Sequence, residues 1–586
     1  MIFNIKGRTI LRAFVTILLT TTLGRAGDLT ERYQLTFDRV LKGGHPVYTP
    51  ELVLADLVPV AKHVYTDYSG DLSGRYVGAL SLAEIELGRS FEALDDIVPR
   101  MLVLQKEPGY FGAGFNETAV AGSEMTLLWG NGRLLIGLLE YYRMNPQPAV
   151  LAAARRIGDF LTRVAPLLNN DDLRKQINSK KDIAAGYICW TQTIEGLAEL
   201  YRVTRDSRYL EVADQTAWRT VRHPAQHTHG FLTSVRGIVD LYNVTGEAKY
   251  LEKAEREWQG VIDSGNLLVQ GAVPEIFLPA NNIPVLRTEG CAEVDWLRLS
   301  LALWQLTGNT KYIEQAERTL FNEFAMNQFQ TGDFGERPIS TSGTPVGAGP
   351  DGLGSNRCWF CCTLHGLRGF ADVFSRVFRV KSGSLWFDLP VDGCGKVEGF
   401  VVTATSELGQ NGTVKLVITA CDQAAHSLFV RRPAWASGIE ITVNTAAVPT
   451  SVADGFVEIR RRWKSGDVVS LTYAMQTRAE RKNGHVALFH GPWLLGVDDK
   501  TNPYFRDELW QNKENKLLLK PAADGAVELK RVLSPTGRFS YPVAHFRVKY
   551  LPGGYPLQPA TALLRPVAEQ TGEPSTAWAF WFQTAP

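Results

Sequence analysis

The sequence predicts a multidomain α+β protein in which a ring of helical hairpins, a helical toroid, is followed by β-sandwich modules. Three observations predict this fold class. Apolar residues recur at helical spacing up to about residue 375, one helix–turn–helix signature occurs three times, and the hydrophobic period changes to that of strands near residue 380. The length of 586 residues is enough for about three to four domains.

The repeated signature marks turns between helices. Residues 201–213, 242–254 and 304–316 each contain an aromatic residue that ends an apolar helix, a turn that includes Thr, and a Tyr-led helix. Their starts are about 41 and about 62 residues apart, and such uneven spacing argues against a solenoid with repeats of fixed length. A closed ring of helical hairpins accommodates uneven spacing, so the pattern favours an α/α toroid.

From residue 379 onward the sequence predicts β structure. Short strand-like runs such as 415–420 and 468–473 follow one another at spacings typical of β-sandwiches, and the last hundred or so residues are rich in Pro and Gly. We therefore expect a helical domain over residues 27–378, a β-sandwich over 379–480 and a second β-rich domain over 481–586.

The first residues are typical of an export signal. A basic segment that ends at Arg12 precedes the apolar stretch 13–23, and Gly24 and Ala26 supply small residues for a cleavage site. This pattern predicts a signal peptide over residues 1–26 and a secreted or periplasmic protein. We expect no membrane attachment after cleavage, because no later stretch is apolar enough to span a bilayer.

The charge balance excludes one class of partner. The 62 Lys and Arg residues oppose 61 Asp and Glu residues, so no positive excess indicates nucleic-acid binding. The 14 Trp, 19 Tyr and 27 Phe residues supply aromatic faces of the kind on which sugar rings stack. Aromatic residues are also common in cores, so this composition is compatible with a saccharide ligand without requiring one.

The seven cysteines contain the most specific pattern in the chain. Glu289 and Cys291 are two residues apart, so both side chains face one side of an extended segment, and the adjacent pair Cys361 and Cys362 follows about 70 residues later. Three thiolates and one carboxylate would make a tetrahedral zinc site. The alternatives are unrelated buried thiols, or a site that uses Cys358, whose spacing to Cys361 is also typical of metal ligands.

At these residues the sequence resembles the β-L-arabinofuranosidase type glycoside hydrolases, family 127 and its relatives. The resemblance includes the Glu-x-Cys and Cys-Cys elements, the helix end at 320–322, and residues 431–436, 455–463 and 484–492. It implies an (α/α)6 barrel with a zinc ion held by Glu289, Cys291, Cys361 and Cys362. It also implies an exported, retaining enzyme that removes terminal β-L-arabinofuranosyl or a related unusual sugar from plant or microbial glycans.

The resemblance implies that the first cysteine of the pair, Cys361, is the nucleophile. Zinc keeps a thiol deprotonated, and the thiolate can attack the anomeric carbon to give a thioglycosyl intermediate. A purely structural zinc clamp between two chain segments is the alternative. The resemblance also implies an acid/base Glu shortly before the Glu-x-Cys element, and Glu275 is the only carboxylate between Asp263 and Glu289, in a Pro-rich stretch typical of a loop. A solvated loop carboxylate is the alternative there, and Asp263 is the next candidate.

Substrate contacts are expected from the barrel helices. The family carries substrate-contacting histidines on these helices. In this sequence Trp190 and Thr233 stand where the resemblance implies two of them. We expect Trp190, Trp129, His227 and His229 to contact the sugar, with Trp129 as a stacking residue. Core packing is the alternative for Trp129, and a solvated or helix-capping role, or metal binding, is the alternative for the two histidines.

Two other functions fit a helical toroid. One is a polysaccharide lyase or unsaturated uronyl hydrolase, which would not need the thiolate site. The other is a glycan-binding protein that keeps the fold of the family without its activity. Tightly held zinc that is lost on replacement of Cys361 or Cys362 would separate the zinc-thiolate glycosidase from both.

Overall fold

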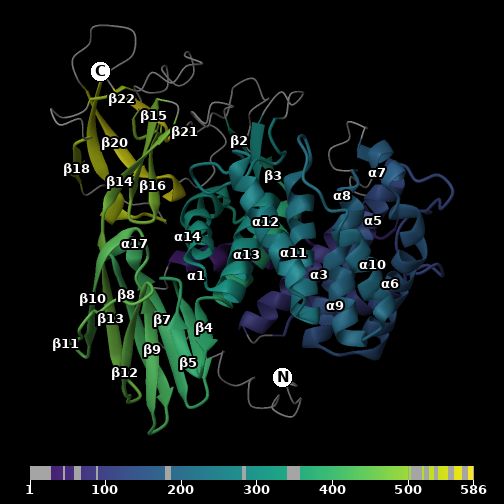
Figure 1. The fold of residues 1–586 in the computed structure, drawn as a ribbon, viewed down its shortest axis with the longest axis horizontal. Helices are drawn as coiled ribbons and strands as arrows, with labels where there is room; N and C mark the ends of the chain where they lie inside the picture. Colours follow the sequence, from purple (N-terminus) through teal and green to yellow (C-terminus); the bar gives the residue numbers. More distant parts are fainter. Residues whose placement is uncertain are drawn as a thin grey trace.

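The fold is taken from a computed structural model (Figure 1). It describes residues 28–43, 47–58, 68–87, 90–178, 186–279, 286–339, 357–482, 484–498, 500–502, 518–520, 527–532, 539–551, 560–569 and 578–584. The expected signal peptide, residues 1–26, lies outside the described residues. None of the described helices is long and apolar enough to cross a membrane.

Within the described residues, six helices form a closed ring. The contacts run round the ring in chain order, and the last helix packs against the first. The ring consists of α3 (Asp71–Leu87), α5 (Gly122–Met144), α9 (Thr193–Thr204), α11 (Thr228–Thr245), α13 (Gly290–Thr307) and α16 (Phe360–Phe374). The predicted helical toroid is thus confirmed, and the β domains that follow it confirm the α+β fold class.

A second layer of helices surrounds the ring. Inner helices such as α13 are buried on every face, because they meet the barrel axis on one side and the outer layer on the other. Outer helices keep one polar face towards solvent. The outer layer is made of α1 (Asp28–Lys42), α4 (Glu92–Leu102), α6 (Pro148–Leu168), α10 (Ser207–Ala217), α12 (Ala248–Asp263) and α14 (Thr310–Arg318).

Shorter helical segments connect these layers. They are α2 (Pro50–Ala55), α7 (Asp171–Asn178), α8 (Ile188–Thr191), the π-helical turn η5 (Thr319–Phe324), α15 (Ala325–Asn327), α17 (Leu408–Asn411), η6 (Pro542–Ala544) and η7 (Val567–Glu569). The π-helical turn continues α14 and packs against α13, which bears part of the site described below.

The repeated sequence signature is the turn from an inner to an outer helix. α9, α11 and α13 end at residues with positive φ, namely Arg205 (59°), Gly246 (74°) and Gly308 (68°). In each turn this residue donates its backbone N–H to the carbonyl of the aromatic residue four positions earlier. Glycine takes this left-handed conformation without a Cβ clash, which explains Thr-Gly at two of the three turns.

The ring helices begin at a common end of the barrel. Trp129, in the second turn of α5, donates to Asp71, the first residue of α3. The residue before α9, Gln192, donates to the Trp129 carbonyl, and Cys291 near the start of α13 contacts Cys362 near the start of α16. The helix N-termini, with their unpaired N–H groups and positive dipole ends, therefore surround one polar region.

Three strands cover part of this end of the barrel. β1 (Leu286–Glu289), β2 (Gly335–Ile339) and β3 (Arg357–Cys358) form an antiparallel sheet in that order. In the β1–β2 pairing Glu289 lies opposite Glu336. β1 leads directly into α13, and β3 comes just before α16, so the sheet fixes where both helices begin.

The middle of the chain forms two antiparallel-rich sheets beside the helical body, green at the lower left of Figure 1. The side chains of β8 and β13 alternate between buried and exposed, as expected for strands with one face in a core. The first sheet has the order β12 (Phe456–Arg462), β9 (Ala425–Arg431), β5 (Ser384–Phe387), β4 (Phe378–Lys381). The second has the order β11 (Ala446–Ala447), β10 (Ala436–Val443), β13 (Val468–Met475), β8 (Thr413–Cys421), β7 (Phe400–Glu407), β6 (Gly393–Val397).

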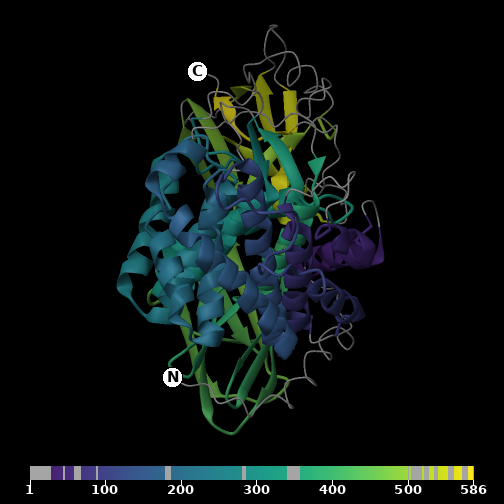
Figure 2. The same ribbon diagram turned by 90° about the vertical axis from the view of Figure 1, so that its right-hand side faces the viewer.

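The C-terminal strands form a further sheet, yellow in Figure 1, and Figure 2 shows the helical body lying in front of both β regions. Asn322, in the π-helical turn, bonds to the backbone of Pro492 and Leu494 and so joins this sheet to the barrel. The strands are β14 (Thr477–Lys482), β15 (His485–His490), β16 (Trp493–Asp498), β17 (Leu518–Leu519), β18 (Leu529–Arg531), β19 (Phe546–Leu551), β20 (Ala560–Pro566), β21 (Trp578–Ala579) and β22 (Phe582–Thr584).

A buried ion pair joins the barrel to the middle β domain, and its loss is expected to destabilise the protein. Arg431 on β9 pairs with Glu317 on α14, and both side chains are almost fully buried. Because Arg431→Met leaves the Glu317 carboxylate buried without its partner, we expect a loss of about 3–5 kcal/mol. Thermal unfolding measures the shift, and Arg163→Met, which breaks the exposed pair with Glu117, serves as the control with little effect. An equal shift in both variants would contradict this role.

Candidate metal and active site

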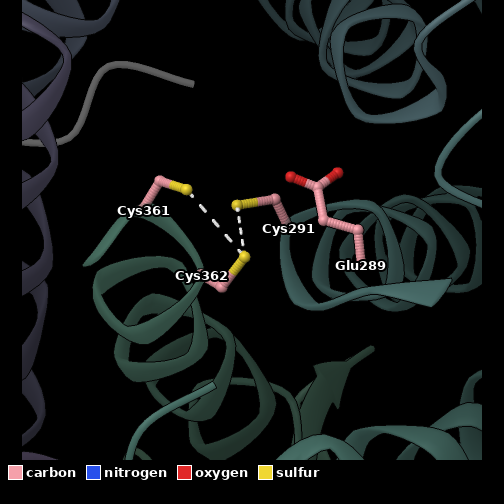
Figure 3. A group of neighbouring side chains, drawn as sticks. All are labelled: Glu289, Cys291, Cys361 and Cys362. Atoms are coloured by element: carbon pink, nitrogen blue, oxygen red, sulfur yellow. Dashed lines mark hydrogen bonds between the residues drawn. The ribbon is translucent and has the colours of Figure 1, made fainter. Parts of the chain in front are cut away.

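Three cysteines and one glutamate meet where β1 joins α13 and where α16 begins (Figure 3). Glu289 is the last residue of β1 and Cys291 the second residue of α13, while Cys361 and Cys362 are the second and third residues of α16. One ligand atom from each of the four lies within 4.8 Å of the others. Strand pairing and helix initiation thus place two chain segments, about 70 residues apart in sequence, at one point.

The spacing of the sulfur atoms fits a zinc ion. The Cys291 and Cys362 Sγ atoms are 3.6 Å apart, and those of Cys361 and Cys362 are 3.9 Å apart. Tetrahedral zinc with bonds of about 2.3 Å to sulfur places its ligands about 3.8 Å from one another. The Glu289 carboxylate points to the same place (Figure 3). Cys358 is exposed on β3 and lies outside this group of four.

The three thiols are not equivalent. Cys291 and Cys362 are fully buried, and burial raises the pKa of each well above its ordinary value. Cys361 is partly exposed, and hydrogen bonding with Cys291 and Cys362, together with the nearby Arg75 cation, lowers the pKa of its thiol well below the ordinary value. Of the three sulfurs, that of Cys361 is the accessible one and the one whose pKa its neighbours lower.

Glu275 is held beside the cluster by backbone contacts on two sides. Its N–H donates to the carbonyl of Arg287 in β1, and its carbonyl accepts from the N–H of Thr228 at the start of α11. Burial raises the pKa of Glu275 to about 7, the neighbouring Glu289 adds to this, and His227 opposes it. A carboxyl group of this kind exchanges its proton near neutral pH, although a cation held by Glu289 would lower the value.

His227 and His229 are both buried, which contradicts the solvated alternative considered for them. His227 occupies the N-cap position of α11, but its side chain makes no capping hydrogen bond. Instead its Nε2 lies 3.2 Å from Glu289 Oε2, and this carboxylate raises the pKa of the ring in spite of the opposing effect of burial. His229 points into the barrel, where its Nδ1 lies 2.7 Å from Asp295 Oδ2.

A second group of possible metal ligands, formed by His229, Asp295 and His365, does not fit a metal ion. The Asp295 carboxylate already accepts hydrogen bonds from both histidines and from Thr233 and Arg236. Each of the two Asp295 carboxylate oxygens is paired with two of these donors, which leaves no lone pair for a cation. The group is therefore a closed hydrogen-bond network below the cysteines.

The two tryptophans expected at the site lie in different places. Trp129 is next to the histidines, with ring centroids 6.0 Å from His227 and 5.4 Å from His229, and it is 4% exposed. Trp190 has no exposed surface, and its indole N–H donates to Asn169 from the loop after α6. This is the placement of a core residue, so the structure brings Trp129 to the site and leaves Trp190 outside it.

Sequence reasoning missed the charged residues beneath the cluster, above all Arg75 and Asp295. Both are almost fully buried. Asp295 is four residues after Cys291 on α13 and so shares its face of the helix. Charged residues in a helix that is apolar on every face between them, such as Asp295 and Arg298 in α13, were the available signal, because such residues must find partners inside the protein.

The comparisons with known proteins agree with this fold and site. The model of the GH127 β-L-arabinofuranosidase catalytic domain matches residues 68–373, and the model of the GH127 middle domain matches residues 392–475. No curated protein matches the chain in a sequence search. The match to the glycosidase catalytic domain covers more than half of the chain and coincides with the helical barrel. The protein is therefore a glycoside hydrolase. The chain belongs to the GH127 β-L-arabinofuranosidase family.

Solved structures show the same fold over nearly the whole chain. Ara127N-Se, a GH127 β-L-arabinofuranosidase from Geobacillus stearothermophilus T6, is 15% identical, with a TM-score of 0.69 over 96% of this chain and 99% of that chain. The GH127 β-arabinofuranosidase BT3674 is 17% identical, with a TM-score of 0.70 over 96% of each chain. At these identities the likeness shows a shared fold alone.

Proposed function

We propose that the protein is a retaining, zinc-dependent glycoside hydrolase with Cys361 as nucleophile and Glu275 as acid/base. The observation that carries the proposal is the meeting of one partly exposed thiol with two buried thiols and a carboxylate at zinc-like spacing. Glu275, whose pKa burial raises to about 7, is held next to this group. A nucleophile and a proton donor are what a retaining glycosidase requires.

Each residue has a defined part in the two steps. The Cys361 thiolate attacks the anomeric carbon, while protonated Glu275 gives its proton to the leaving oxygen and the aglycone departs as an alcohol. In the second step the Glu275 carboxylate takes a proton from water, which attacks the anomeric carbon and releases the thiolate. Two displacements retain the anomeric configuration. Zinc bound to Glu289, Cys291, Cys361 and Cys362 would keep the thiols deprotonated at neutral pH.

The sugar follows from the family. The family name and the first similar structure describe a β-L-arabinofuranosidase and the second a β-arabinofuranosidase, so we assign terminal β-L-arabinofuranosides of glycans as the substrate class. We propose Trp129 and His227 as sugar contacts, a choice supported by the contact of His227 with Glu289 and of Trp129 with His227. The N-terminal sequence supports export, so the substrate would be met outside the cytoplasm.

Metal analysis tests the proposed site. We expect about one zinc per chain, loss of that zinc with Cys291→Ser or Cys362→Ser, and a lower melting temperature after treatment with a chelator, because bound metal stabilises the native state. Cys394→Ser, which removes an exposed thiol on β6, is the matched control and should keep its zinc. Cys358→Ser should keep it as well. Zinc lost from Cys358→Ser but retained in Cys362→Ser would contradict the assigned ligand set.

A further inference from the structure

Arg75, on the first turns of α3, contacts the cysteine cluster at Cys291. Its three guanidinium nitrogens each have a different partner: Nε donates to Asp71 Oδ1 at 2.7 Å, the first terminal nitrogen lies 3.6 Å from Cys291 Sγ, and the second lies 2.8 Å from His229 Nε2. The side chain is 3% exposed. No other arginine or lysine among the described residues is recorded in contact with a sulfur of the cluster.

We infer that Arg75 is a positioning residue that holds Cys291 as a permanent metal ligand and thereby leaves Cys361 as the attacking thiolate. The inference rests on the proposed function. The inference goes beyond the proposed function because it explains the different roles of the three cysteines by a residue that is neither a metal ligand nor in contact with the reacting atoms.

Charge is the first reason. Three thiolates and one carboxylate around a divalent zinc ion leave the site with a net charge of −2, and such a charge is costly in a buried place unless a cation compensates it. Arg75 supplies a buried positive charge in direct contact with the cluster. An arginine suits this position better than a lysine, because its fork of donors serves several acceptors at once and it stays charged.

The second reason is that the other two partners of the Arg75 guanidinium hold it in one orientation. Asp71, which holds Nε, also accepts the indole N–H of Trp129 at 2.9 Å. His229, which faces the other terminal nitrogen, is fixed on its far side by Asp295, and burial lowers the pKa of this ring well below its ordinary value. A neutral ring that donates from Nδ1 to Asp295 must accept at Nε2, so it accepts from Arg75.

The third reason is the difference between the sulfurs. A hydrogen bond to a thiolate withdraws charge from it and makes it a poorer nucleophile. The Arg75 guanidinium makes this contact with Cys291, which is fully buried. Cys361 is partly exposed and has no such contact with the guanidinium. The arrangement therefore binds one sulfur and leaves the other, at the accessible side, free to attack carbon.

The test compares Arg75→Lys and Arg75→Met with the parent protein by two measurements that do not depend on turnover. The first is the rate at which zinc is released to an excess of a colorimetric chelator. Loss of a partner in contact with a metal ligand typically costs about 10–100-fold in metal affinity, so we expect release from R75M to be faster by about that factor and from R75K by less. The second is the sulfur-to-metal charge-transfer band of the cobalt-substituted protein, which should move to longer wavelength when Cys291 loses its hydrogen bond.

The control is Arg32→Met, which removes a guanidinium of similar burial whose partners are Asp28, Tyr541 and the backbone carbonyls of Ala325 and Ala568 in place of a cysteine. It should leave the release rate and the cobalt band unchanged even where it lowers the melting temperature. If R75M does not fold, the measurements on R75K test the inference, because lysine keeps the positive charge and lacks the several donors of the guanidinium. Release rates and cobalt bands like those of the parent in a folded R75K and R75M would overturn the inference. A parent protein that holds no zinc would instead overturn the proposed function.

Discussion

Replacement of Cys361 by serine is expected to abolish turnover even on substrates with an activated leaving group. The serine hydroxyl is a much weaker nucleophile than a thiolate, so no glycosyl–enzyme bond forms, and the proposed zinc site loses one of its three sulfurs. The loss should exceed that of any other single substitution at the site. It is measured as the initial rate with an aryl β-L-arabinofuranoside, together with the zinc content of each preparation.

Two comparisons make this result specific to the nucleophile. Cys421→Ser, which removes a partly buried thiol on β8 far from the barrel, should retain normal activity. Incubation of the parent protein with an activated substrate, followed by acid quench and mass spectrometry of peptides, should find the sugar on Cys361. Sugar attached to Cys358 or to a carboxylate, or full activity in C361S, would refute the assignment.

Replacement of Glu275 by glutamine is expected to have the second largest effect, and one that depends on the leaving group. An alkoxide needs a proton in order to depart, whereas an activated phenolate needs little help, so poor substrates should slow by about 10²–10⁴-fold and activated substrates far less. The second step still needs a base to activate water. The glycosyl–enzyme should therefore accumulate on activated substrates and give a burst of phenol equal to the enzyme concentration.

Asp263→Asn is the matched control for this experiment. Asp263 was the next candidate by sequence, but it is exposed at the end of the outer helix α12, where it accepts a hydrogen bond from Gln259. Its replacement should leave both classes of substrate unaffected. Equal losses on activated and poor substrates in E275Q, without a burst and with normal zinc content, would remove Glu275 from the acid/base role.

The fold could be predicted from the sequence because its signals are local. The Thr-containing turns at Arg205, Gly246 and Gly308 are short, and their left-handed residues and Tyr-led helices recur visibly along the chain. The change to period-two alternation near residue 380 is equally local, and β4 begins at Phe378. The closure of the ring by α16 against α3 follows from tertiary packing, which the turns do not encode.

The meeting of Glu289, Cys291, Cys361 and Cys362 was predictable because cysteine is rare and the spacing of these residues is distinctive. The residues that hold them were not. Arg75 and Asp295 are ordinary charged residues on helices far apart in the sequence, and only the closed ring brings α3, α11 and α13 to one place. Trp190 is a residue that the sequence placed at the site and the structure places in the core. Its indole N–H donates to Asn169, and its ring has no exposed surface.

Because the ring helices all begin at the same end of the barrel, the sequence is constrained differently at its two ends. At the end where the helices begin, each contributes a different group, such as Asp71 from α3 and Cys291 from α13, and no two starts are interchangeable. At the opposite end the turns only reverse the chain, and there the sequence repeats itself. Insertions or fused tags at the turns after Arg205, Gly246 or Gly308 would therefore lie a helix length away from the chemistry. The barrel can change its outer contour, and with it the surfaces it offers to other molecules, while its catalytic end stays the same.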